Sequence, residues 1–119
     1  MATKSFKDLI VWQRAGELTT EVYRVFSGNK DYGFRDQIQR ASVSIMNNVA
    51  EGYARRSDKS FRQFLLIAKG SAAEVESMLV VASHLNYVSE TEKRSLMQKT
   101  DEISRLLSGF IKKLSAEDS

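Results

Sequence analysis

Apolar residues return at the spacing of an α-helix through four successive segments of this chain, and no proline interrupts any of them. Short polar breaks separate the segments, which predicts helices over about residues 6–27, 33–55, 58–86 and 89–115. Connections this short place consecutive helices side by side and antiparallel. The sequence therefore predicts one all-α domain over residues 1–119, an up-down-up-down antiparallel four-helix bundle.

Two serines match the pattern of a helix start. Ser89 is followed three residues later by Glu92, the spacing in which the two residues cap each other's backbone N–H groups. Ser5 and Asp8 have the same spacing with a shorter acid. These pairs predict the starts of the fourth and first helices.

The third segment has more apolar residues than one buried face needs. Its main stripe consists of Phe61, Phe64, Leu65, Ala68, Ala72, Val75, Leu79 and Ala82. A second line, Leu66, Ala73 and Val80, repeats every seven residues on another side. A four-helix bundle buries roughly one stripe per helix, and contiguous apolar patches are uncommon on monomers. The surplus predicts self-association, unless a loop or the tail of the chain covers it.

The first segment has a similar surplus. One seam consists of Val11, Ala15, Leu18, Val22 and Val25, and a second consists of Trp12, Gly16, Thr19, Tyr23 and Phe26. The fourth segment has a single narrow apolar stripe with charged residues opposite it. We therefore expect Trp12 and the second line of the third helix to take part in assembly.

Polar residues form a line on the second segment, where a simple amphipathic helix would have Leu, Lys or Ala. Arg40, Ser44, Asn47 and Glu51 lie opposite the apolar face, with Asn48 at the boundary. The line is either a ligand or nucleic-acid surface with Arg40 as its cation, or a polar seam between helices or subunits. We favour the seam.

Gly52 lies on the apolar face of the same segment. Glycine in a helix interior costs roughly 1 kcal/mol relative to alanine, so its benefit should be close packing or a local break. We therefore interpret Asn48, Glu51 and Gly52 as packing and assembly residues rather than as a site.

Positive charge gathers at the break between the second and third segments. The cluster consists of Arg55, Arg56, Lys59 and Arg62, and Asp58 is the only acidic residue between the first and last of them. Lys69 lies further along the third segment. These cations, together with Arg40, suit phosphate groups. No aromatic single-strand platform or base-reading motif is apparent, so binding should be backbone-directed, salt-sensitive and low in sequence specificity.

Residues for catalysis are scarce. His84 is the only histidine and there is no cysteine, so neither a di-iron carboxylate bundle nor a thiolate metal site is available. No serine has the context of a hydrolase nucleophile, and no phosphate-binding glycine motif occurs. We expect no enzymatic activity, no catalytic residue, no metal and no cofactor.

The location of the protein is also indicated by sequence. The first residues lack the apolar run of a signal peptide, and the most apolar stretch is interrupted by Lys69, Glu74 and Glu76. We expect a cytoplasmic protein with no membrane partner.

The chain resembles a family of bacterial proteins encoded in intervening sequences of 23S ribosomal RNA. The similarity covers about residues 5–114 and rests on D-L-x-V-W, Q-I-x-R-A-x-x-S-I, N-x-A-E-G and A-x-G-S-x-x-E-x-E, in that order. The same family includes the accessory variability protein of diversity-generating retroelements. The resemblance implies a four-helix bundle that assembles as a homopentameric barrel.

The resemblance also implies partners. The retroelement member is understood to bind nucleic acid and a reverse transcriptase, whereas the members encoded in ribosomal RNA have no established activity. Two hypotheses follow for this chain. It is a nucleic-acid-associated accessory protein that binds RNA or DNA, or it is a protein-interaction scaffold whose charges only confer solubility.

Overall fold

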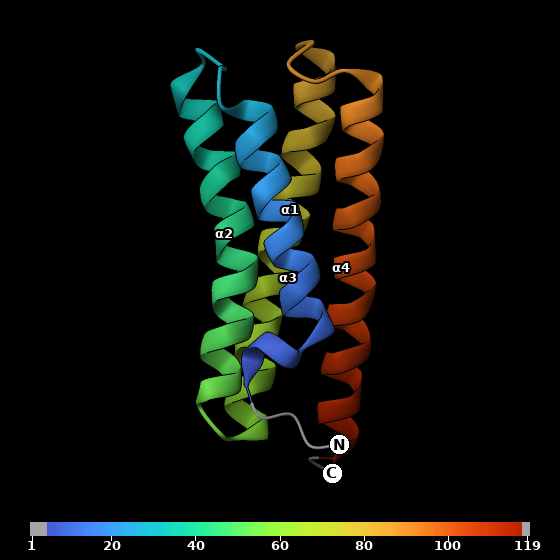
Figure 1. The fold of residues 1–119 in the computed structure, drawn as a ribbon. Helices are drawn as coiled ribbons and strands as arrows, with labels where there is room; N and C mark the ends of the chain where they lie inside the picture. Colours follow the sequence, from blue (N-terminus) through green and yellow to red (C-terminus); the bar gives the residue numbers. More distant parts are fainter. Residues whose placement is uncertain (1–4, 118–119) are drawn as a thin grey trace.

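The computed structural model describes residues 5–117, and within this range the chain forms helices and no strand. A short 3-10 helix, η1 (Phe6–Asp8), precedes four long helices (Figure 1). The long helices are α1 (Ile10–Phe26), α2 (Tyr32–Ala54), α3 (Asp58–His84) and α4 (Glu90–Glu117). The predicted all-α fold of four helices is confirmed. Residues 1–4 and 118–119 of the predicted domain lie outside the described residues.

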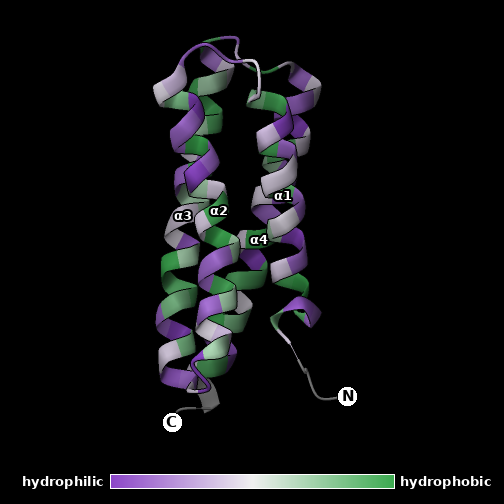
Figure 2. Ribbon diagram, turned by 60° about the vertical axis from the view of Figure 1, so that its left-hand side comes forward, coloured by the Kyte–Doolittle hydropathy of each residue, from purple (hydrophilic) through white to green (hydrophobic). Residues whose placement is uncertain are grey.

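One apolar stripe from each helix lines the core. Its largest fully buried side chains are Leu18, Phe26, Ile38, Ile45, Leu65, Leu79, Leu96, Ile103 and Leu107. Burying a side chain of this size stabilises the fold by about 1.5–3 kcal/mol. Hydrophobic and hydrophilic residues are interspersed along every helix (Figure 2). No helix in the described part of the chain is long and apolar enough to cross a membrane.

Contacts between α2 and α3 run in opposite order along the two helices. Gln37 donates a hydrogen bond to Glu74 and Ser44 shares one with Ser71, while Gly52 lies against Phe61 near the start of α3. The two helices are therefore antiparallel neighbours, which places the end of α2 beside the first turns of α3.

Side-chain and backbone hydrogen bonds cap the ends of the helices. The backbone N–H of Ser89 donates to Glu92 at 2.9 Å, and the N–H of Glu92 donates to the Ser89 hydroxyl at 3.0 Å, which confirms the predicted capping box. At the end of α3, Asn86 has a left-handed φ of 60° and Tyr87 N–H donates to the Ala82 carbonyl. This is a Schellman termination with asparagine in the position that usually holds glycine.

The predicted start of the first helix at residue 6 is wrong. The backbone is extended at Leu9, and the α-helix begins only at Ile10. Leu9 has no side chain that can cap a helix, whereas Ser5 caps η1 by accepting a hydrogen bond from Lys7 N–H. The break also lets the Phe6 ring pack edge-to-face on Trp12, with centroids 5.1 Å apart.

Candidate nucleic-acid interface

The basic cluster lies where α2 passes into α3. Arg55 caps the end of α2, Arg56 is in the connection, and Lys59 and Arg62 are in the first turns of α3. The structure thus brings together four of the six predicted cations at one end of the bundle.

Intramolecular contacts occupy two of these four cations. The Arg55 guanidinium pairs with Glu51 at 2.9 Å and lies over the Phe64 ring. Arg62 donates a hydrogen bond from Nε to the Ser115 hydroxyl on α4. Within the described residues, Arg56 and Lys59 have no acidic group within 4.0 Å, and both are exposed.

Arg56 also has an unusual backbone. Its φ is 58°, in the left-handed region that a residue with a Cβ rarely adopts. Such a conformation costs of order 1 kcal/mol and persists only where the surrounding structure enforces it. Here it ends α2 and turns the chain within a short connection to the N-cap residue Ser57.

Arg40 and Lys69 are not part of the cluster. Arg40 precedes Arg55 by four turns of α2, or about 22 Å along the helix axis, and Lys69 follows Lys59 by about 15 Å on α3. Both side chains are exposed. The six cations therefore do not form one compact site within a single chain.

Residues in the polar line of α2 make hydrogen bonds and an ion pair within the chain. Asn48 Nδ2 donates to the Ser44 carbonyl at 2.8 Å and to its hydroxyl at 3.0 Å, and Ser44 in turn bonds Ser71 across the helix pair. Glu51 pairs with Arg55 on the same helix. These contacts give Asn48 and Glu51 a structural role without a second copy.

The second apolar line of α3 is exposed. Leu66 is 42% exposed and Val80 38%, with Ala73 exposed between them. We call these residues, with Ile67, Gly70 and Val81, the α3 outer face. A Cβ on Gly70 would meet no atom within 4 Å, so nothing in the chain itself requires glycine there.

The second seam of α1, in contrast, is largely covered by the chain itself. Phe26 is fully buried, and Thr19 donates to the Ala15 carbonyl and the Ser42 carbonyl of α2. Trp12 packs on Phe6. Within the chain the seam therefore packs in part against α2 and η1, and the expected role of Trp12 in assembly stays a prediction. Trp12 and Gly16 remain half-buried, and Tyr23 is exposed.

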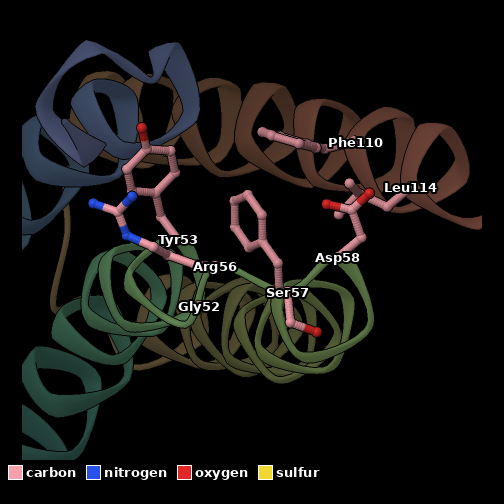
Figure 3. A pocket seen from close by; sticks show the side chains of 8 residues that line it. Gly52, Tyr53, Arg56, Ser57, Asp58, Phe110 and Leu114 are labelled. Carbon is pink, nitrogen blue, oxygen red and sulfur yellow. The ribbon is translucent and has the colours of Figure 1, made fainter. Parts of the chain in front are cut away.

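A pocket opens beside the basic cluster, and we call it the aromatic pocket (Figure 3). Its volume is about 380 Å³, and it is lined among others by Tyr53, Arg56, Asp58, Phe61, Phe110 and Leu114. The sequence analysis missed it because Tyr53, Phe61 and Phe110 come from three different helices. The position of each residue in the apolar pattern of its own helix indicates only that it belongs to the core.

The other residues that could serve in catalysis or bind a metal do not lie together. His84 is exposed at the end of α3. Within the described residues, no three His, Cys, Asp or Glu side chains are placed to hold a metal ion. Glu74 contacts Gln37 rather than a second carboxylate.

Comparison with protein-family models identifies the family of this chain. The family model for the 23S rRNA-intervening sequence protein matches residues 7–109. The chain belongs to this family. The match spans most of α4 and all of α1, α2 and α3, so it includes both the basic cluster and the α3 outer face.

A solved structure has the same fold. It is a protein of unknown function from the S23 ribosomal protein family of Bacteroides thetaiotaomicron VPI-5482, with a TM-score of 0.81 and 26% sequence identity. The similarity covers 87% of this chain and 99% of that one. No curated protein sequence matches this chain.

Proposed function

We propose that this protein is a non-enzymatic accessory protein that associates with RNA or DNA as a homo-oligomer. Arg56 and Lys59 carry the proposal, because they are exposed cations, three residues apart in the chain, without an acidic partner among the described residues. Partnerless cations keep their full charge for phosphate groups, and such contacts hold a nucleic acid without reading its sequence.

Assembly would multiply this weak surface. The unit is an up-down-up-down bundle, and the α3 outer face is its proposed contact with further copies in a pentameric barrel. Exposed large apolar side chains along one helix, Leu66 and Val80 among them, favour such a contact. Five chains would place five basic clusters on one particle, and multivalent binding raises affinity without any new contact.

The test is a matched pair of charge reversals. Arg56→Glu with Lys59→Glu should weaken binding of a fluorescent single-stranded oligonucleotide and lower the salt slope by about 0.7 for each lost phosphate contact. Lys93→Glu with Arg94→Glu makes the same change of net charge at the opposite end of the bundle and should have a much smaller effect. Equal losses in both variants would mean that only net charge attracts the strand, and would refute the assignment.

A second candidate function is a protein-interaction scaffold, which the α3 outer face also favours. In that case the basic cluster confers solubility, and the assembled barrel docks another protein, such as the reverse transcriptase of a retroelement. Failure of the wild-type protein to bind any oligonucleotide at low salt would support this hypothesis. The hypothesis would be contradicted if charge reversal at Arg56 and Lys59 abolished oligonucleotide binding while the mass of the assembly stayed unchanged.

A further inference from the structure

Phe110 lies between two hollows on the surface of the bundle. One is the aromatic pocket, in which Phe110 and Leu114 of α4 lie across from Tyr53 at the end of α2 (Figure 3). The other, which we call the adjoining hollow, has a volume of about 370 Å³ and is lined by Arg105, Leu106, Gly109, Phe110 and Lys113. The Phe110 side chain is only partly buried. Part of the Phe110 side chain is therefore open to solvent.

Three aromatic rings pack against one another in the lining of the pocket. Phe61 packs edge-to-face on Phe110, with centroids 5.0 Å apart, and on Tyr53 at 6.0 Å. Phe61 is only 8% exposed and belongs to the core, so its ring supports the other two. A volume of about 380 Å³ lies within the range of small-molecule sites, which are mostly apolar with a few polar groups.

Gly109 is an exposed residue in the lining of the adjoining hollow. It lies in the interior of α4, where glycine costs about 1 kcal/mol relative to alanine. A Cβ at this position would meet no atom within 4 Å, so packing inside the chain does not explain the glycine. A side chain at this position would be added to the lining of the hollow. Close approach of a ligand is a physical reason for glycine at such a position.

Cations line both of the hollows that Phe110 lines. Arg56 lines the aromatic pocket, and Arg105 and Lys113 line the adjoining hollow. Arg105 has only an exposed pair with Asp101, while Arg56 and Lys113 have no acidic group within 4.0 Å among the described residues. Asp58 is the acid in the lining of the pocket. The net positive charge favours an anionic ligand.

We propose that this region binds an unstacked nucleotide of single-stranded RNA or DNA, with the base against the Phe110 ring and the neighbouring phosphates at Arg56 and Lys113. An aromatic ring flanked by cations is the arrangement by which proteins hold single strands, because every base has a face that can stack. A duplex keeps its bases stacked on each other and cannot use the ring. The inference rests on the proposed function and adds to it a preference for single strands that phosphate contacts alone do not produce.

The experiment compares two probes of equal charge, a ten-nucleotide thymidine strand and the same backbone with abasic sites throughout. Wild-type protein should bind the base-bearing strand about tenfold more tightly, the effect of one stacked base. Phe110→Leu should remove that difference and leave the abasic strand unaffected. Tyr32→Leu, an exposed aromatic residue at the other end of the bundle, is the matched control.

A second variant distinguishes loss of binding from loss of folding. Gly109→Gln should close the adjoining hollow while raising the melting temperature, because glutamine is the better helix former. It should lower affinity for the base-bearing strand alone, whereas Gly33→Gln at the start of α2 should not. If both strands bind wild-type protein equally, the pocket assignment fails and the phosphate-binding function stands. If neither strand binds at low salt, the proposed function itself fails.

Free thymidine monophosphate distinguishes the source of the nucleotide. It should compete at least a hundredfold less well than the strand, because it lacks the neighbouring phosphates. Competition at equal concentration would overturn the single-strand assignment and mark the pocket as a site for a free nucleotide.

Discussion

Gly52 and Phe64 hold α2 and α3 so close together that a Cβ at position 52 would lie 2.7 Å from the Cβ of Phe64 and 2.9 Å from the Phe61 ring. The two helices are in backbone-close contact just before the chain turns at Arg56. The position of the turn, and with it the basic cluster, therefore depends on the absence of a side chain at residue 52.

Gly52→Ala should destabilise the fold in spite of alanine's higher helix propensity. The propensity gain is about 1 kcal/mol, but forcing a methyl group into a closed contact costs about 1–3 kcal/mol. Urea unfolding followed by circular dichroism measures the difference. Gly16→Ala, at a position with open space around it, is the control and should be stabilising. Stabilisation by both substitutions would contradict the packing role of Gly52.

Arg56→Gly should raise stability and lower binding at the same time. Glycine relieves the cost of a left-handed φ, a gain of up to about 1 kcal/mol, while the change removes a cation from the interface. Asn86→Gly is the matched control, since asparagine already tolerates φ near 60° and the expected gain is smaller. Thermal melts and oligonucleotide titrations give the two readouts. A less stable Arg56→Gly would show that the side chain supports the turn.

The Glu21–Lys99 pair should make stability depend on acid pH. Its Oε2 and Nζ atoms are 2.6 Å apart, and the Glu21 side chain is only 17% exposed. Burial acts to raise the pKa of Glu21, but hydrogen bonds from Lys99 and Ser95 and the charges of Lys99 and Arg24 outweigh it, so the pKa is lowered. A lowered pKa in the folded state means that the unfolded chain binds the proton more readily.

The pair's contribution should thus be present above the ordinary carboxyl pKa of about 4.3 and be lost as the pH falls through the lower folded value. Glu21→Gln should cost about 1 kcal/mol at pH 7 and almost nothing at pH 2, measured by urea unfolding. Glu17→Gln removes the more exposed pair with Arg14 and should change little at either pH. A constant cost of Glu21→Gln across this range would show that its charge is irrelevant.

Substitutions on the α3 outer face should dissociate the assembly and leave the bundle folded. Leu66→Glu and Val80→Glu place charge on a surface that lies outside the core, so the melting curve of the monomer should stay cooperative. Native mass spectrometry should show a fall from a multiple of 13.5 kDa to the single mass. Ile10→Glu, an equally exposed apolar residue of α1, is the control. A monomeric wild type would contradict the assembly that we propose.

Several features of the fold follow from local chemistry and were predictable. Helical periodicity located four helices, and the Ser89–Glu92 pair marked the start of α4 because a capping box needs only residues three apart. The cost of glycine in a helix interior predicts either close packing or a local break at Gly52, and the structure shows close packing. The cluster at Arg55 and Arg56 was visible because its members are consecutive. The break at Leu9 was not predicted, because Phe6 continues the apolar pattern of the helix.

The sequence by itself determined the helices and the basic connection, since both depend on residues that are neighbours along the chain. Only the tertiary structure decided which surplus apolar residues face water. Thr19 and Phe26 are covered by the chain itself, whereas Leu66 and Val80 are exposed, and helical spacing alone cannot distinguish the two cases. The aromatic pocket is likewise a product of packing. Phe110 reaches Phe61 only when α4 lies against α3, and no short-range pattern records that contact.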